Sequence, residues 1–192
     1  MTMKPLFTPT SGASANTALA PYAAQRRRLG WAGLLGYGLS ASGLGSMVAC
    51  SSYETAPNTR FLLLDGSSVT TADLKGKVTL VNFWATTCVS CVKEMPSIVR
   101  TYQKFRDRGY ETVAVAMSYD PPQWVNNFST SRQLPFKVAL DNTGEVAKQW
   151  GDVKLTPTTY LVNKQGQIVK RFVGEPDFAA LEQLVDKLLA QT

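Results

Sequence analysis

From residue 61 onward, the apolar positions fall into short runs that are separated by polar turns. Runs rich in branched and aromatic residues predict buried strands, because such side chains pack well on a pleated sheet. The strands predicted in this way span residues 78–84, 112–117, 136–140, 158–162 and 168–173. The last two strands flank the turn sequence Lys164-Gln165-Gly166, which predicts a hairpin. An earlier apolar run, Phe61–Leu64, precedes the turn signal Asp65-Gly66.

Helical stretches lie between these strands. The first opens at Cys88 or Cys91 and reaches about Arg108, where Gly109 is expected to end it. Further helices are predicted at residues 122–130, 145–150 and 177–190, and the last of them has one apolar face.

The order of these elements limits the possible folds. Strands joined through helices pair in parallel, whereas the hairpin near the end adds an antiparallel edge. We therefore expect an α/β domain over residues 60–192, in which a mixed central β-sheet is flanked by helices in three layers.

The first 50 residues have a different character. Arg26-Arg27-Arg28 precedes residues 29–49, which carry no charge. Positive charges followed by an apolar stretch are typical of an export signal, and an uncleaved membrane anchor is the alternative. Residues 47–50, Met-Val-Ala-Cys, resemble the lipobox of bacterial lipoproteins, which predicts lipidation at Cys50; a chance cysteine at the end of an anchor is the alternative. Residues 51–59 are predicted to be a linker.

Charge and composition exclude several classes of function. The net charge is +6, but residues 1–50 hold four basic and no acidic residues. The remainder has 16 basic and 14 acidic residues, a net charge of +2, so nucleic acid is not expected as a partner. The chain contains no histidine, which excludes Ser-His-Asp and Cys-His nucleophiles and every metal site that needs imidazole.

Cys88-Val89-Ser90-Cys91 is the motif with the clearest chemistry. The predicted strand delivers the chain to a helix start, where free backbone N–H groups and the helix dipole favour a thiolate at Cys88. Cys88 would attack a disulfide, and Cys91 would resolve the mixed disulfide that results. A stabilising disulfide or two buried free cysteines are the alternatives, although so small a loop stabilises little. One C-x-x-C without a second pair cannot complete a tetrahedral zinc site, so no metal is expected here.

Two longer stretches carry a resemblance to a known family. Residues 81–96, which include the two cysteines, resemble the active-site stretch of TlpA-like (ResA-like) thioredoxin-fold disulfide reductases, some of which act in cytochrome c maturation. Residues 155–163, Leu-Thr-Pro-Thr-Thr-Tyr-Leu-Val-Asn, resemble the family's cis-proline loop and the strand that follows it. The resemblance covers residues 58–190 and implies a thioredoxin-like fold.

The resemblance also implies roles for individual residues. Cys88 would be the nucleophile and Cys91 the resolving thiol. Pro157 would be cis and place Thr156 beside the disulfide, where its backbone can pair with an extended substrate; an ordinary loop proline is the alternative. Glu94 matches the family's acid that manages the Cys91 proton, although it can also be a surface carboxylate near the helix start.

Other positions near the motif leave the direction of electron flow open. Trp84 could contact substrate beside the site, or belong to the core. Thr87 stands where the family usually has tryptophan, and the spacer Val89-Ser90 lacks the common proline. Asn82 stands where cytoplasmic thioredoxins place a buried aspartate.

The sequence therefore predicts a thiol–disulfide oxidoreductase that is tethered to the membrane of a bacterial cell envelope and acts on its periplasmic side. We expect a reductase of exported proteins, recharged by a membrane electron donor and needing no cofactor. A thiol peroxidase is excluded, because its signature requires threonine three residues before the reactive cysteine and Ala85 is there instead. A thiol oxidant and a non-enzymatic dithiol that binds copper(I), with Met95 or Met117 as thioether ligands, are the alternatives.

Overall fold

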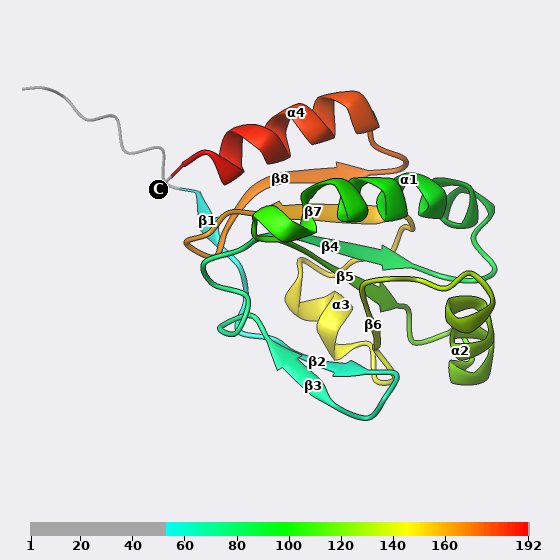
Figure 1. The fold of residues 1–192 in the computed structure, drawn as a ribbon. Helices are drawn as coiled ribbons and strands as arrows, with labels where there is room; N and C mark the ends of the chain where they lie inside the picture. Colours follow the sequence, from blue (N-terminus) through cyan, green and yellow to red (C-terminus); the bar gives the residue numbers. More distant parts are fainter. Residues whose placement is uncertain (1–52, 192) are drawn as a thin grey trace, which may run out of the picture. The chain divides into compact units, whose positions relative to one another are not determined.

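The computed structural model describes residues 53–191, which form a β-sheet with helices on both faces (Figure 1). The eight strands of the sheet are β1 (Glu54–Thr55), β2 (Arg60–Leu63), β3 (Ser68–Thr70), β4 (Val78–Trp84), β5 (Tyr110–Ala116), β6 (Lys137–Leu140), β7 (Thr158–Val162) and β8 (Gln167–Val173). The helices are α1 (Val89–Phe105), α2 (Pro122–Ser131), α3 (Glu145–Gln149) and α4 (Phe178–Leu189).

The sheet is mixed, as the sequence predicts. Its strand order is β1-β8-β7-β4-β5-β6-β2-β3. Strands β4, β5 and β6 pair in parallel, whereas β7 runs antiparallel to β4 and β8 antiparallel to β7. The end of β4, the end of β5 and the start of β7 therefore meet at one edge of the sheet, with Trp84 opposite Ala116 and Phe83 opposite Thr158.

Alternating side chains of the central strands build a core on each face of the sheet. On β4, Val78, Leu80 and Trp84 belong to the core that includes buried residues of α1 and α4. Val81 and Phe83 belong to the second core, which includes Ala147 of α3. Because both faces are covered, all seven residues of β4 are buried, and the predicted three-layer α/β fold is confirmed.

Two strands were not predicted from the sequence. The predicted apolar run at 61–64 forms most of β2, which pairs with β3 across the turn that follows it. Strands β1 and β3 are two and three residues long and contain one buried residue between them, Val69, so they give almost no apolar pattern. Because β1 pairs with β8 and Ala56 is buried, residues 54–56 of the predicted linker pack against the domain.

Helix α1 follows the predicted limits, with one difference at its end. Its α-helical part stops at Phe105, and a single 3-10 turn, Arg106–Arg108, continues to Gly109. Gly109 has φ 91°, a left-handed conformation that suits glycine and ends the helix where the sequence predicts. The predicted export segment and Cys50 lie outside the described residues. Among residues 53–191, no helix has the length and apolar character needed to cross a membrane.

Candidate active site

The two cysteines of the motif occupy the start of α1. Beyond β4 the chain makes a turn that is closed by the Cys88 N–H, which donates to the Ala85 carbonyl at 3.1 Å. Cys88 is the N-cap of α1, and its sulfur accepts the Cys91 N–H at 3.2 Å. The sulfurs form a disulfide, with Cα atoms 5.2 Å apart.

The two sulfurs differ in their accessibility. Cys88 is partly exposed, whereas Cys91 has no exposed surface and lies in the core beneath α1. The spacer residues Val89 and Ser90 are exposed. A substrate can therefore reach Cys88, and Cys91 is placed to react with its partner from inside the protein.

Glu94 lies one helical turn after Cys91 and is fully buried, with no exposed surface. Its Oε1 accepts a hydrogen bond from Asn82 Nδ2 at 2.9 Å, and the same nitrogen donates to Thr159 Oγ1 at 2.9 Å. Its Oε2 has no hydrogen-bond partner among residues 53–191. Burial raises the pKa of Glu94 from 4.5 to about 7, and Glu175 adds to this shift, whereas the Asn82 hydrogen bond opposes it. The surface alternative for Glu94 is therefore wrong.

The Thr156–Pro157 peptide bond is cis, as the resemblance implies. Strand β7 begins directly after Pro157, so the register of β7 with β4 brings this loop to the edge where the cysteine turn leaves the sheet. The Pro157 carbonyl accepts the Gly174 N–H at 2.8 Å, and Thr156 is partly exposed.

The structure decides between the two interpretations of Trp84 in favour of the core, and corrects its assignment as a substrate contact. Its side chain is fully buried, and its ring packs against Phe128 of α2 with centroids 5.1 Å apart. Trp84 and Phe128 meet because the Trp84 side chain points to the side of the sheet that α1 covers, and α2 packs over the end of β4 on that side. Trp84 therefore belongs to the core.

A further loop at the same edge was not predicted to be part of the site. Asp120 follows β5 and accepts two hydrogen bonds from Thr86, two residues before Cys88. The neighbouring Tyr119 hydroxyl lies 3.3 Å from Thr156 Oγ1. The predicted parallel pairing of β4 and β5 was a signal for this loop, because the carboxyl ends of parallel strands share an edge.

Exposed apolar side chains gather around the cysteines. Val89 (84% exposed), Leu155 (66%), Tyr119 (58%) and Trp124 (54%) come from the spacer, the cis-proline loop, the loop after β5 and α2. Beside them, a hollow of about 490 Å³ is lined by Thr86, Thr87, Trp124, Asn127, Phe128 and Ser131. Apolar surface of this kind is typical of a site that binds another polypeptide.

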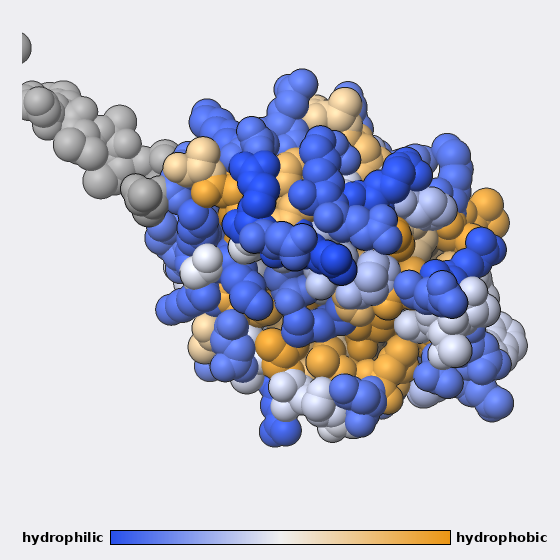
Figure 2. All heavy atoms as spheres, in the orientation of Figure 1, coloured by the Kyte–Doolittle hydropathy of each residue, from blue (hydrophilic) through white to orange (hydrophobic). Residues whose placement is uncertain are grey.

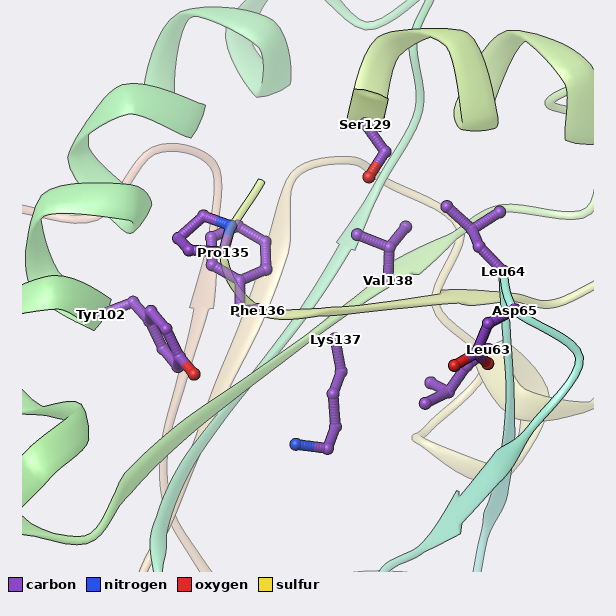
Figure 3. Close-up of a pocket in the computed structure, with 9 residues that line it drawn as sticks. All are labelled: Leu63, Leu64, Asp65, Tyr102, Ser129, Pro135, Phe136, Lys137 and Val138. Atoms are coloured by element: carbon purple, nitrogen blue, oxygen red, sulfur yellow. The ribbon is translucent and has the colours of Figure 1, made fainter. Parts of the chain in front are cut away.

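A separate pocket of about 280 Å³ lies away from the cysteines (Figure 3). Figure 3 shows Tyr102 and Phe136 on one side of it and Leu63 and Leu64 on the other. Figure 2 shows hydrophobic residues reaching the surface between α1 and the β2–β3 hairpin. No residue of the predicted site lines this pocket, so it is distinct from the dithiol site.

The two candidate thioether ligands of the copper(I) alternative, Met95 and Met117, lie in different cores. Met95 lies in the core beneath α1 together with Cys91, whereas Met117 belongs to the core on the other face of the sheet. The two methionines therefore do not share one core with the sulfurs. Within the described part of the chain, no group of three or more His, Cys, Asp or Glu side chains is arranged to hold a metal ion.

Comparison with known proteins agrees with this geometry. Residues 52–185 match the Redoxin family. The thiol-disulfide oxidoreductase ResA of Bacillus subtilis is 37% identical over 142 residues, which cover 73% of this chain and 77% of the relative. ResA of Bacillus thuringiensis is 35% identical over 135 residues, which cover 70% and 77%.

Among solved structures, a thiol:disulfide interchange protein of the thioredoxin family from Chlorobium tepidum superposes with a TM-score of 0.67 and 26% identity. The match covers 74% of this chain and all of that protein. A cysteine pair at a helix start, a cis-proline loop beside it and these relatives agree with one another. The chain belongs to the Redoxin family and is a ResA-like thiol–disulfide oxidoreductase with Cys88 and Cys91 as its redox pair.

Proposed function

We propose that this oxidoreductase is a disulfide reductase of exported proteins, in which Cys88 attacks and Cys91 resolves. The observation that carries the proposal is the asymmetry of the pair. Cys88 caps α1 and is partly exposed, whereas Cys91 is buried and Glu94 is buried one turn further along the helix. An accessible nucleophile and a protected resolving thiol suit a two-step exchange.

The steps follow from this arrangement. In the reduced protein, the Cys88 thiolate attacks one sulfur of the substrate disulfide, forming a mixed disulfide and releasing the other substrate sulfur as a thiolate. The Cys91 thiolate then attacks the Cys88 sulfur, which forms the Cys88–Cys91 disulfide and releases the second substrate thiolate. Two electrons pass from the protein to the substrate, and a donor must return them before the next cycle.

Glu94 is proposed to accept the proton that Cys91 loses in the second step. A carboxylate with a pKa of about 7 is matched to proton transfer near neutral pH. Its Oε2, which has no hydrogen-bond partner in the described part of the chain, is available for a proton, while Asn82 holds Oε1 in place.

The substrate is proposed to be an extended segment of a polypeptide. The Thr156 backbone, beside cis Pro157, would pair with this segment as an added strand. The apolar side chains around Cys88 would contact residues that flank the substrate cysteine, and Val89 and Leu155 are the most exposed of them.

The protein is proposed to act outside the cytoplasm of a bacterial cell, on the periplasmic side and tethered to the membrane. Support comes from Arg26-Arg27-Arg28 with the uncharged stretch 29–49, and from the lipobox-like sequence that ends at Cys50. A membrane electron donor and a role in cytochrome c maturation are part of this proposal. Labelled lipid should be incorporated into the wild type and lost in Cys50→Ala; an unlabelled wild type would exclude lipidation.

The direction of the reaction is tested by the reduction potential of the Cys88–Cys91 pair and by insulin reduction with dithiothreitol as electron donor. We expect a potential near that of thioredoxin, about −270 mV, and faster precipitation of insulin than dithiothreitol gives alone. A potential of about −120 mV would instead indicate a thiol oxidant. The Cys88→Ser variant is the matched control and should be inactive.

The Cys91→Ser variant tests the order of the two sulfurs, because a mixed disulfide formed at Cys88 cannot then be resolved. Expressed in cells, this variant should capture exported proteins, whereas the double variant with Cys88→Ser should capture none. Titration of the reduced wild type with copper(I) tests the non-enzymatic alternative. Tight binding of copper(I) together with no insulin reduction would favour that alternative.

A further inference from the structure

We propose that Asp120 is a positioning residue for the redox pair, which holds the turn before Cys88 in place through two hydrogen bonds to Thr86. The proposal deepens the proposed function, because it rests on Cys88 being the attacking thiol. No sequence motif marks Asp120; its place at the site comes from the loop geometry after β5.

The contact between Asp120 and Thr86 uses both oxygens of a buried carboxylate. Asp120 is 4% exposed. The Thr86 N–H donates to Asp120 Oδ2 at 2.6 Å, and the Thr86 hydroxyl donates to Oδ1 at 2.6 Å. Two hydrogen bonds from one residue fix the orientation of its peptide as well as its position, and bonds to a carboxylate are stronger than bonds to a neutral acceptor.

The carboxylate itself is held by the backbone around it. The Asp120 N–H donates to the Met117 carbonyl at 2.9 Å, and the Met117 N–H donates to the Trp84 carbonyl at 3.0 Å, which ties the loop to the end of β4. Pro121 and Pro122 follow, and proline restricts its own φ and the conformation of the residue before it.

The constraint on Thr86 reaches Cys88 through a single turn. Thr86 lies inside the turn that the Cys88 N–H closes on the Ala85 carbonyl. That turn delivers Cys88 to the N-cap position, where its sulfur faces the Cys91 N–H at 3.2 Å. A looser turn would let the Cys88 sulfur leave the helix N-terminus and lose the interactions that favour a thiolate.

A direct electrostatic effect of Asp120 on Cys88 would disfavour the thiolate, whereas positioning by Asp120 favours it. A buried negative charge close to Cys88 opposes formation of a second negative charge on the sulfur, so its removal would favour the thiolate. Positioning and charge therefore predict opposite shifts in the reactivity of Cys88, and one set of variants can separate them. The charged groups on α1 and near it, Lys93, Glu94 and Glu175, are unchanged in these variants.

The variants are Asp120→Asn, Thr86→Val, Thr86→Ser and Asp141→Asn. Asp120→Asn places an amide NH2 where one carboxylate oxygen accepts a hydrogen bond. Thr86→Val replaces the hydroxyl by a methyl group and keeps the N–H, whereas Thr86→Ser keeps the hydroxyl. Asp141 is the matched control, because it is 2% exposed and accepts two N–H groups at the start of α3, at 3.1 and 2.8 Å. Among residues 53–191 its carboxylate has no hydrogen bond to the turn before Cys88.

The measurement is the rate at which iodoacetamide alkylates Cys88 in the reduced full-length chain from pH 4 to 10, followed on the Cys88 peptide by mass spectrometry. Far-ultraviolet circular dichroism confirms that each variant is folded. We expect a higher pH midpoint in Asp120→Asn and Thr86→Val, and a rate at pH 7 that is lower by about tenfold and about threefold, in line with the loss of hydrogen bonds to a charged acceptor. Thr86→Ser and Asp141→Asn should match the wild type.

Three results would overturn the proposal. A lower pH midpoint in Asp120→Asn would show that Asp120 acts on Cys88 through its charge. An unchanged pH midpoint in Thr86→Val would show that the hydrogen bonds between Asp120 and Thr86 do not affect Cys88. A shift in Asp141→Asn as large as that in Asp120→Asn would indicate general loosening of the domain. Failure of the wild type to reduce insulin would refute the proposed function alone, because alkylation does not depend on turnover.

Discussion

Replacing Glu94 by glutamine tests the most unusual ionisable group of the site. The side chain is fully buried, one helical turn after Cys91. Glutamine has nearly the same size and keeps a carbonyl oxygen that can accept the hydrogen bond from Asn82. The substitution therefore removes the proton equilibrium while preserving the packing.

The raised pKa of Glu94 makes stability depend on pH. Burial raises this pKa from 4.5 to about 7, so between these values the folded protein binds more protons than the unfolded chain. The contribution of Glu94 to stability is complete below pH 4.5 and is lost as the pH rises through 7. At about 1.4 kcal/mol for each pH unit, the loss is on the order of 3 kcal/mol.

The assay is urea unfolding of the oxidised protein at pH 5, 6, 7 and 8. We expect the free energy of unfolding of Glu94→Gln, relative to that of the wild type, to increase as the pH rises. The increase from acid pH to pH 8 should be about 3 kcal/mol. Glu145→Gln is a suitable control, because Glu145 is exposed on α3 and pairs with Lys148 at 3.7 Å. Its effect should stay within about 0.5 kcal/mol at every pH.

The same variant tests the proposed proton transfer. In the wild type, resolution of a mixed disulfide at Cys88 should accelerate as Glu94 loses its proton near pH 7. In Glu94→Gln the rate of resolution should be about one tenth of the wild-type rate or lower, and it should not show this pH dependence. Parallel stability curves for variant and wild type from pH 5 to 8 would refute the raised pKa. Equal resolution rates would refute the role in proton transfer and leave the burial argument intact.

Three other substitutions distinguish support of the site from contact with substrate. Trp84→Phe should lower the free energy of unfolding by about 1–2 kcal/mol, because the buried ring packs on Phe128, and alkylation of Cys88 should stay unchanged. Trp124→Ala removes an exposed ring; urea unfolding should change by less than about 0.5 kcal/mol, while the second-order rate of insulin reduction falls several-fold. Tyr119→Phe removes the hydroxyl facing Thr156 and should lower that rate by about twofold or threefold without changing alkylation of Cys88.

The central part of the fold could be predicted because its signals are local. Residues 78–84 form a strand with the predicted limits, since an uninterrupted run of branched and aromatic residues suits a strand covered on both faces. Strands β1 and β3 could not be predicted, because with one buried residue between them they exist through pairing with β8 and β2 rather than through a pattern of their own. The cysteine pair and cis Pro157 were predicted because each lies within a short motif.

The parts of the site that escaped prediction depend on residues that are distant in sequence. Trp84 was open to two interpretations until α2 was placed over the end of β4, and packing against Phe128 decides for the core. Asp120 is 34 residues from Thr86 in sequence, and only the parallel pairing of β4 with β5 brings the two together. Sequence spacing carries no direct record of such a contact.

The two acids near the dithiol show why residue type alone does not assign a role. Both oxygens of Asp120 accept hydrogen bonds from Thr86, so the whole carboxylate is used to hold the turn before Cys88. Glu94 has one oxygen bound by Asn82 and one without a partner among residues 53–191, in surroundings that raise its pKa to about 7, so it can gain and lose a proton without disturbing the turn. The number of donors that each carboxylate meets, set by the strands and loops that bring them together, therefore separates a group that holds Cys88 in position from one that can serve Cys91.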